Sequence, residues 1–466
     1  MAQLTFLGAI GEVTGSRYLI ETENARVLME CGLRQGSPRA ERANRRSLRR
    51  LATGLDAVVL SHGHLDHAGL LPKLVRDGFG GPIFCTTGTR ELLDIMFRDA
   101  AGLMARDVEW ENRRRERAGR PLVEPVYTLE DVEQTLKQCR PIHLGSNEEV
   151  VEGMRVTFFD AGHILGSAIV ELLIEDAGRR RHLVFSGDLG NPDSALMRDP
   201  TRMQEADVVL MESTYGDREH RPMDETVEQL AQILASAERG GGNVLIPAFA
   251  VGRTQEILYH LSLLQQAGRL PQQKVFLDSP MAIRVTELYD RRPDLLDDAD
   301  LGALPVAADG DLARALPQLE LTRDVEDSMA INRIKGGAII IAGSGMCTGG
   351  RIRHHLKYNL WREQNHVVIV GFQAGGTLGR LLVDGVRRVK LFGEQIAVKA
   401  QIHTLGGFSA HAGQAQLLDW ARAFHGRPAF HLVHGEPEAR EALAAALKRE
   451  CGIDAHTPAY EETIEL

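Results

Sequence analysis

The sequence lacks the features that mark secreted, disulfide-bonded or membrane-spanning proteins. Its 466 residues include five cysteines, which are scattered and form no Cys-x-x-Cys pair. This usage is typical of free, buried thiols in a reducing cytoplasm. No basic segment followed by an apolar one opens the chain, so we expect no export signal. No apolar run is long enough to cross a bilayer. We therefore expect a cytoplasmic protein without a membrane partner.

An overall excess of positive charge is also absent. The formal net charge is −10, which by itself does not indicate a nucleic-acid partner. Arginine is nevertheless clustered in two stretches, around Arg45 and around Arg114. Either stretch could face phosphates, or each could be an arginine-rich solvated helix surface. The sequence leaves both interpretations open.

Length and composition indicate a soluble protein of more than one domain. The chain has room for two or three domains, each with its own core. An apolar content of 43% and a charged content of 25% are those of a globular protein.

A histidine-rich loop is the most informative stretch of the chain. Ser-His-Gly-His-Leu-Asp-His (residues 61–67) follows an apolar run that predicts a buried strand and precedes a helical pattern. His62 and His64 are two residues apart, so they point the same way along an extended backbone. Asp66 and His67 follow, where the turning chain can direct them at a second ion. Imidazole nitrogen and carboxylate oxygen are zinc ligands, so the loop predicts a metal site. The alternative is a solvated loop with chance histidines.

Three further predicted strands end in a histidine or a carboxylate. His163 follows the predicted strand over residues 154–160, and Asp188 follows the one over 182–186. Glu212 follows the strand over 207–211. A single histidine is usually a hydrogen-bonded core or surface residue, but four such loops at strand ends are poorly explained by chance.

From about residue 218 to 394 the pattern changes to a second α/β unit. Short apolar strands alternate with helical patterns there, which predicts a parallel sheet. Two loops between strand and helix are candidates for phosphate binding, one containing Arg253 and the other Ser344 and Arg351. The second loop fails the spacing of both dinucleotide and P-loop motifs. Tight strand–helix packing explains both loops equally well.

The last part of the chain again offers metal-binding residues. Phe-Ser-Ala-His contains Ser409 and His411, and Val-His-Gly-Glu places His434 after an apolar strand. If His434 completes the second metal site, the last segment must pack back onto the first domain.

Taken together, the chain resembles the β-CASP branch of the metallo-β-lactamase superfamily. Six motifs carry the resemblance: Ser-His-Gly-His-Leu-Asp-His, Ala-Gly-His-Ile-Leu-Gly-Ser, Ser-Gly-Asp-Leu-Gly, Glu-Ser-Thr-Tyr-Gly-Asp, Phe-Ser-Ala-His and Val-His-Gly-Glu. The resemblance implies an α/β fold, an αββα sandwich with an inserted parallel-sheet β-CASP domain. The implied boundaries are 1–217 for the first part of the sandwich, 218–394 for the insertion and 395–466 for the returning segment.

The resemblance also implies a role for each candidate residue. One zinc ion would take His62, His64 and His163, a second would take Asp66, His67 and His434, and Asp188 would bridge the two. Glu212 and His411 match the branch's acidic and histidine motifs near the leaving group. Glu30 stands where the family usually has Asp, so it is expected to support the metal-ligating histidines rather than bind metal itself. Arg253, Ser344, Arg351 and Ser409 are the candidates for substrate phosphate.

These roles predict a zinc-dependent ribonuclease. Two zinc ions can lower the pKa of a bridging water to about 7 and clamp a phosphoryl displacement. His411, oriented by Glu212, would protonate the leaving 3′ oxygen, giving 5′-phosphate and 3′-hydroxyl products. The presence of His434 favours single-stranded RNA over DNA, and a homodimer is a further expectation. The alternatives are a small-ester or lactam hydrolase, a DNA nuclease and a non-catalytic scaffold.

Overall fold

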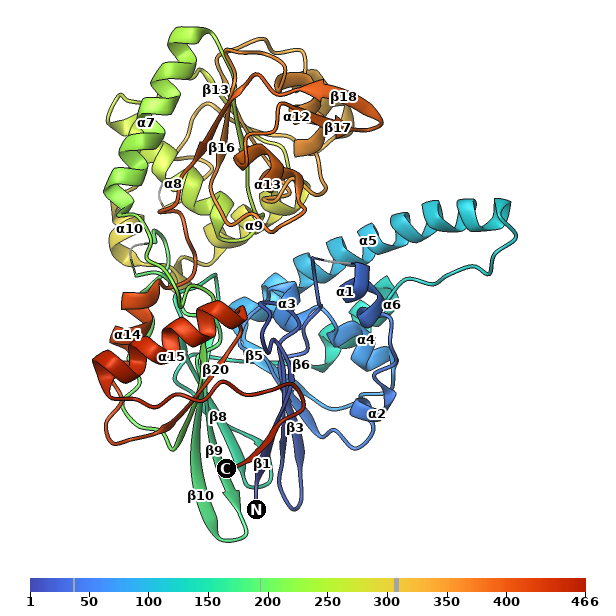
Figure 1. Cartoon of the computed structure of the whole chain (residues 1–466), viewed down its shortest axis with the longest axis vertical. Coiled ribbons are helices and arrows are strands. Elements are labelled where there is room, and N and C mark those ends of the chain that lie inside the picture. The colour runs from blue at the N-terminus through green and yellow to red at the C-terminus, as the bar shows by residue number, and fades with distance from the viewer. Residues whose placement is uncertain (37, 193, 306–309) are drawn as a thin grey trace. The chain divides into compact units, whose positions relative to one another are not determined.

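The computed structural model describes residues 1–36, 38–192, 194–305 and 310–466 (Figure 1). The chain divides into two compact units. Unit 1 comprises Met1–Pro192, Arg198–Glu219 and His411–Leu466. Unit 2 comprises Asp193–Met197 and His220–Ala410. The chain therefore leaves unit 1, builds most of unit 2, and returns to unit 1 for its last segment.

The first sheet of unit 1 has seven strands. Their order is β21 (Thr463–Glu465), β1 (Gln3–Gly8), β2 (Arg17–Glu21), β3 (Arg26–Met29), β4 (Ala57–Val59), β5 (Ile83–Thr86) and β6 (Cys139–Ile142). The β1–β3 meander is antiparallel, whereas β3 to β6 are parallel. Parallel strands with both faces covered need continuous apolar residues, and all three residues of β4 are buried.

The second sheet of unit 1 has six strands. Their order is β20 (Ala429–Val433), β11 (Val208–Glu212), β10 (Arg179–Phe185), β9 (Ala168–Asp176), β8 (Met154–Asp160) and β7 (Asn147–Val151). One buried cluster joins the facing sides of the two sheets and includes Phe6 and Ile20 from the first sheet and Phe158 and Leu210 from the second. Apolar side chains thus form the central layer between the sheets.

Helices cover the outer face of each sheet in unit 1. The helices are α1 (Pro38–Asn44), α2 (Arg49–Ala52), α3 (Leu65–Ala68), α4 (Leu71–Arg76), α5 (Thr87–Arg117), α6 (Leu129–Gln138), α14 (Gln414–Arg422) and α15 (Pro437–Cys451). One core cluster packs α4 to α6 against the first sheet, and another packs α14 and α15 against the second. The four layers confirm the predicted αββα sandwich.

Helix α5 extends well beyond the sandwich it begins on (Figure 1). The Thr86 hydroxyl caps its first turn by accepting a hydrogen bond from the Thr89 amide at 3.1 Å. The second arginine cluster lies at its far end, where the Arg114 guanidinium covers the ring of Trp110. Arg113 and Arg115 form ion pairs with Glu acids one turn earlier, so part of the cluster is neutralised within the helix.

Unit 2 is built on a parallel sheet, as the alternation of strand and helix patterns predicts. The strand order is β14 (Leu319–Leu321), β13 (Lys274–Leu277), β15 (Ala338–Ala342), β12 (Val244–Pro247), β16 (His366–Ile369) and β19 (Gln401–Thr404). Every neighbouring pair is parallel. The central strands β12 and β15 are buried throughout, which explains their unbroken apolar sequences.

Helices lie on both faces of the parallel sheet, and a small hairpin is added. The helices are α7 (Met223–Gly240), α8 (Arg253–Gln266), α9 (Pro280–Arg291), the short η1 (Pro293–Leu295), α10 (Asp298–Ala303), α11 (Val325–Ile331), α12 (Ile352–Asn359) and α13 (Leu378–Val383). The hairpin consists of β17 (Arg388–Leu391) and β18 (Glu394–Ala397). Separate apolar clusters occupy the two sides of the sheet, so unit 2 has its own core.

The predicted returning segment contains strand residues of unit 2, because residue 395 lies within β18 and β19 follows. The sequence places the boundary after Glu394, whereas compact unit 2 continues to Ala410. The reason is β19, which hydrogen bonds in register with β16 and completes the edge of the parallel sheet. Compact unit 2 is therefore longer than the predicted insertion, and the assignment of residues 395–410 to a functional domain stays a prediction.

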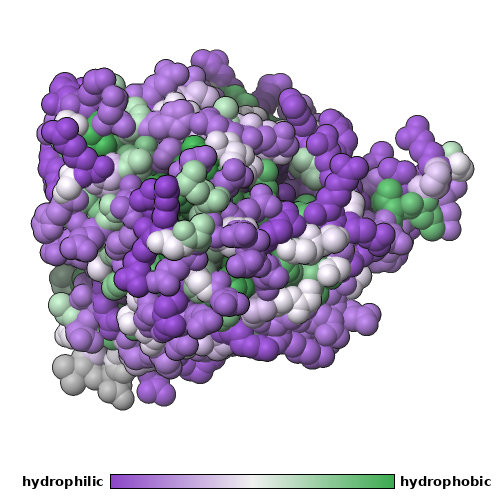
Figure 2. Space-filling view, turned by 90° about the horizontal axis from the view of Figure 1, so that it is seen from below, coloured by the Kyte–Doolittle hydropathy of each residue, from purple (hydrophilic) through white to green (hydrophobic). Residues whose placement is uncertain are grey.

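Among the described residues, no helix combines the length and the apolar character that a membrane span requires. On the face shown in Figure 2, hydrophilic residues predominate and hydrophobic ones are scattered.

Candidate metal centre

The predicted metal ligands all belong to unit 1, in loops that follow strands. Strands β10, β11 and β20 are parallel neighbours, and β8 runs in the same direction two strands away. Their C-terminal ends therefore share one edge of the second sheet. Those ends carry His163, Asp188, Glu212 and His434. The histidine-rich loop after β4 reaches the same edge from the first sheet.

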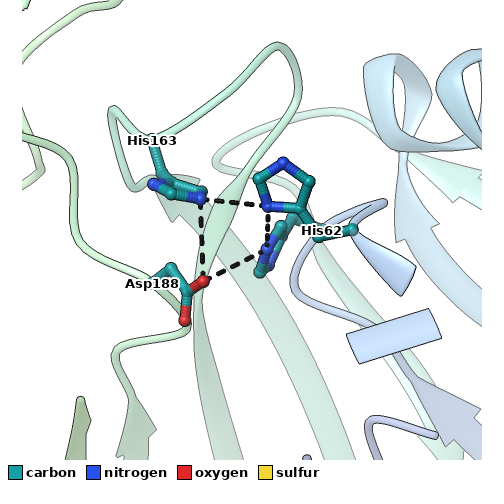
Figure 3. Close-up of side chains that lie close together, drawn as sticks. His62, His163 and Asp188 are labelled. Atoms are coloured by element: carbon teal, nitrogen blue, oxygen red, sulfur yellow. Dashed lines mark hydrogen bonds and ion pairs between the residues drawn. The ribbon is translucent and has the colours of Figure 1, made fainter. Parts of the chain in front are cut away.

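His62, His64, His163 and Asp188 form the first of two clusters. Nδ1 of His64 lies 3.2 Å from Nε2 of His62 and 3.1 Å from Nε2 of His163. An Oδ2 atom of Asp188 lies 3.4 Å from His62 Nε2 and 3.6 Å from His163 Nε2 (Figure 3). Ligands about 2.0–2.1 Å from one tetrahedral ion are about 3.3 Å apart. The four atoms thus have the spacing of one ion's ligand set.

Asp66, His67 and His434 form the second cluster, on the other side of Asp188. Nε2 of His434 lies 3.6 Å from Oδ2 of Asp66. Nε2 of His67 lies 3.2 Å from Oδ1 of Asp188, and Oδ2 of the same carboxylate faces the first cluster. One carboxylate therefore contributes an oxygen to each side.

Unpartnered polar atoms at the centre of these clusters fit metal ions. Within the described residues, His67 Nε2, His434 Nε2 and Asp188 Oδ1 are buried without a hydrogen-bond partner. Buried polar groups are rarely left unpaired, because the desolvation cost is then uncompensated. Imidazole nitrogens and carboxylate oxygens are the donor set that divalent ions such as zinc take. We conclude that the two clusters are built to hold metal.

Hydrogen bonds behind the ligands select the tautomer of His62 and His67. The Ser61 hydroxyl donates to Glu30 at 2.9 Å, so its oxygen accepts the Nδ1–H of His62 at 3.0 Å. The same Glu30 carboxylate accepts the Nδ1–H of His67 at 2.5 Å. Both imidazoles then direct an Nε2 lone pair into the clusters, as coordination requires.

His434 is also oriented by a hydroxyl group, that of Thr214. The Thr214 hydroxyl donates to the His434 carbonyl at 3.3 Å, so its oxygen is available to the Nδ1–H of His434 at 3.0 Å. The sequence analysis assigns no role to Ser61 or Thr214. Both are members of quoted motifs, Ser61 at the start of Ser-His-Gly-His and Thr214 within Glu-Ser-Thr, and this membership is the signal that could have pointed to them.

Burial also keeps the three histidines of the first cluster neutral, as metal binding requires. Desolvation by burial is the largest cause that lowers the pKa of His62, to about 3. Burial likewise lowers the pKa of His64 and His163. Burial alone would raise the pKa of Asp188, but the surrounding histidines outweigh it and hold that pKa well below its usual range. The first cluster therefore presents three neutral imidazoles around an ionised carboxylate.

Glu30 lies behind the histidines and is saturated by donors. It is fully buried at the end of β3, in the left-handed region with φ +62°. Its two oxygens accept from the Ser61 amide at 2.7 Å, the Ser61 hydroxyl and His67 Nδ1. The longer side chain thus reaches both a backbone amide and an imidazole, which is the geometry of a supporting residue.

We expect Glu30→Gln to weaken zinc binding about 10- to 100-fold, because the amide no longer increases the basicity of the His67 imidazole. Zinc affinity measured by competition with a chromogenic chelator tests this effect. Glu152→Gln, a substitution of an exposed acid in the turn between β7 and β8, is the matched control. An unchanged zinc affinity in Glu30→Gln would show that the Glu30 carboxylate does not strengthen zinc binding through His67.

His411 and Glu212 form a hydrogen-bonded pair beside both clusters. His411 Nδ1 lies 3.1 Å from Oε1 of the fully buried Glu212. The His411 ring centroid lies 4.5 Å from that of His163 and 6.1 Å from that of His434. Glu212 also accepts the Leu189 amide at 2.6 Å, so its carboxylate is held in place. The His411 imidazole is thereby aimed at the metal centre.

Charge in this pair favours a protonated imidazole. Burial opposes the charging of His411, but the negative charge of Glu212, aided by Asp188 and Asp66, outweighs it and raises the pKa of His411 to about 9. At neutral pH the ring therefore carries a proton that it can donate. An imidazolium held against a buried carboxylate has the character of a general acid.

The candidates for substrate phosphate lie in unit 2, where several are engaged internally. The Arg253 guanidinium is buried and hydrogen bonds to Glu256. Arg351 donates to Asp278 at 2.6 Å and to the Arg323 carbonyl at 2.7 Å. These two arginines stabilise the unit itself in this structure, and their contact with phosphate stays a prediction.

Both serine candidates have hydrogen-bond partners within the protein. The Ser344 hydroxyl accepts the Thr348 and Gly349 amides at 3.0 and 3.2 Å, closing the loop between β15 and α12. Ser409 is buried, and its carbonyl accepts the hydroxyl of Ser194. Both residues belong to unit 2, and their contact with phosphate stays a prediction.

Three family models match successive parts of the chain. A β-lactamase superfamily domain matches residues 25–241, and a Beta-Casp domain matches residues 254–382. A Zn-dependent metallo-hydrolase RNA specificity domain matches residues 395–458. The last match begins at the boundary that the sequence analysis proposes for the returning segment.

Two relatives align with nearly the whole of this chain. Ribonuclease TTHA0252 of Thermus thermophilus is 41% identical over 445 residues, which cover 94% of each chain. Transcription termination factor FttA of Methanothermobacter thermautotrophicus is 30% identical over 482 residues, covering all of this chain and 72% of that protein. A crystal structure of an Enterococcus faecalis protein of unknown function covers both chains fully, with a TM-score of 0.55 and 13% identity, and supports the fold alone.

Proposed function

Because the chain belongs to the β-CASP branch of the metallo-β-lactamase superfamily and is a hydrolase of that fold, we propose that it is a zinc-dependent ribonuclease. The observation that carries the proposal is one shared carboxylate, Asp188, between two histidine clusters with the His411–Glu212 pair beside them. A relative that is named a ribonuclease and a match to an RNA specificity domain support RNA as the substrate.

The residues around Asp188 would hold two zinc ions. His62, His64 and His163 would bind one ion, Asp66, His67 and His434 the other, and Asp188 both. When bound, such a pair lowers the pKa of a water to about 7 and neutralises charge on a phosphodiester. Glu30, Ser61 and Thr214 keep the three histidines they contact in the tautomer that binding needs.

His411 is the proposed proton donor to the leaving group. In hydrolysis, a water oxygen bonds to phosphorus, the bond from phosphorus to the 3′ oxygen breaks, and that oxygen takes a proton. The fragments then end in a 5′-phosphate and a 3′-hydroxyl. Glu212 holds His411 through Nδ1, which leaves the Nε2–H of the charged ring as the proton to be donated.

Cleavage of end-labelled single-stranded RNA, with DNA of the same sequence, tests the substrate assignment. We expect RNA to be cut by protein whose zinc has been quantified, and the activity to disappear with a chelator and return with zinc. The fragments should carry 5′-phosphates, so a ligase that requires a 5′-phosphate should join them and should fail after phosphatase treatment. An intact RNA in the presence of two bound zinc ions would contradict the ribonuclease and favour a small-ester hydrolase. Faster cleavage of the DNA would favour a DNA nuclease.

Two further parts of the proposal concern location and assembly. We place the protein in the cytoplasm, which its free cysteines favour, since the structure pairs none of the five in a disulfide. The homodimer remains a prediction, to be tested by light scattering.

A further inference from the structure

The exposed side of α12 in unit 2 combines aromatic and basic residues. Ile352, His355 and Leu356 turn into the core, whereas Arg353, Lys357 and Tyr358 lie on the opposite side. Leu360 keeps helical backbone angles (φ −60°, ψ −29°), so Trp361 continues that side one turn further. Tyr358 is 44% exposed and Trp361 is 51% exposed. Large aromatic rings thus face solvent in a row along one helix.

The β17–β18 hairpin lies beside α12 (Figure 1), and its turn carries a third aromatic ring. Phe392, in the hairpin turn, is 47% exposed and stacks on the His354 ring with centroids 4.3 Å apart. The Arg353 guanidinium lies over Phe392 at 5.1 Å. The ion pair between Lys357 and Glu394, 2.5 Å long, also joins helix and hairpin. We call this surface the α12 face; its residues are Arg353, Lys357, Tyr358, Trp361, Arg362 and Phe392.

Charge around the α12 face has the opposite sign to the charge of the chain. Residues 351–399 contain nine Lys and Arg but three Asp and Glu, a net charge of +6. Because the whole chain carries −10, the rest of it carries −16. Among the described residues, Arg353 and Arg362 take part in no ion pair, although both approach backbone carbonyls. Their charge is available to an anionic partner.

Each aromatic ring on this face is accompanied by a cation. Arg362 lies 5.2 Å from the Trp361 ring centre and Lys357 lies 5.8 Å from that of Tyr358. Alternating rings and cations suit single-stranded nucleic acid, because unpaired bases stack on the rings while the cations neutralise phosphates. A paired duplex does not expose its bases for stacking. A folded protein partner would favour a continuous apolar patch, which charged side chains interrupt here.

We propose that the α12 face binds single-stranded RNA as a docking site separate from the metal centre. The proposal rests on the ribonuclease function, which it deepens by naming a second contact for a long substrate. The α12 face would hold an unpaired stretch of RNA by base stacking, without reading its sequence. Its loss would weaken binding of long RNA and raise KM, while chemistry at the metal centre would continue at its normal kcat.

Fluorescence anisotropy of the full-length protein with unstructured RNA of about 16 nucleotides or more tests the face. An Asp188→Asn background prevents cleavage during the titration. We expect the double substitution Tyr358→Ala/Trp361→Ala to raise the Kd for RNA about 10-fold or more, because it removes the two rings on which bases would stack. Arg353→Gln/Arg362→Gln should reduce the slope of log Kd against log salt by about 0.7 for each phosphate contact removed.

Tyr460→Ala is the matched control. Tyr460 is 52% exposed in unit 1 and also has an arginine over its ring, Arg34 at 5.5 Å. Its neighbours Glu461 and Glu462 make the surroundings acidic, so we expect unchanged RNA affinity. A duplex RNA of equal length should bind the parent and the double variant equally.

Two outcomes would overturn the docking site. One is a double variant that binds single-stranded RNA as tightly as its parent. The other is a double variant that keeps RNA affinity but loses a co-purifying protein, which would make the face a protein interface. Hydrolysis of bis(p-nitrophenyl) phosphate, which has no unpaired bases to stack on the α12 face, should be unaffected. If otherwise unmodified protein cuts no RNA, the ribonuclease assignment fails, and the binding titration still decides the docking site.

Discussion

Asp188→Asn should reduce RNA cleavage by at least about 10³-fold, the largest effect that we expect from a single substitution. The carboxylate offers Oδ2 to the His62 and His163 side and Oδ1 to the His67 side, so one change affects both clusters. An amide has one oxygen and no charge, and cannot serve two cations equally. We therefore expect zinc content to fall below two ions per chain.

Zinc quantification by mass spectrometry, together with cleavage rates, checks this expectation. Asp454→Asn is the matched control, because Asp454 is an exposed acid paired with Lys448 on the surface. Circular dichroism should show that both variants remain folded. Two tightly bound zinc ions and a normal rate in Asp188→Asn would mean that the carboxylate is not shared, and the proposed centre would have to be redrawn.

His411→Ala should lower the cleavage rate about 10²- to 10⁴-fold while both zinc ions are retained. The imidazole lies beside the clusters and is held by Glu212, so its loss removes a proton donor and leaves the ligands in place. Separation of rate from metal content is the diagnostic result. A variant that loses zinc together with activity would instead identify His411 as a ligand.

The role of Glu212 has its own signature in the pH dependence. The carboxylate raises the pKa of His411, so Glu212→Gln should lower that pKa. A general acid acts only while protonated, and activity is lost as pH rises through its pKa. We therefore expect the alkaline limb of the pH–rate profile to move to lower pH in Glu212→Gln. An activated leaving group needs little protonation. Glu212→Gln and His411→Ala should therefore slow the cleavage of an RNA with such a leaving group less than they slow the cleavage of ordinary RNA.

The fold and most of the candidate ligands could be predicted from the sequence because their signals are local. Four potential ligands stand within the six residues from His62 to His67, after a strand whose apolar run is unbroken. The same pattern of an apolar strand followed by a histidine or carboxylate recurs at His163, Asp188 and His434. The family resemblance that the short motifs carry predicts the αββα sandwich, and the alternation of strand and helix patterns predicts the parallel sheet of the inserted unit.

Only the tertiary structure decided which partner each polar group has. Glu30 meets His67 from 37 residues away, and Thr214 meets His434 from 220 residues away. The arginines chosen as phosphate candidates illustrate the same limit, since Arg351 finds Asp278 from 73 residues away. Residue type and spacing determine what a side chain is able to bind. Hydrogen bonds and burial, which form when distant strands pair and sheets pack, determine whether it is already engaged.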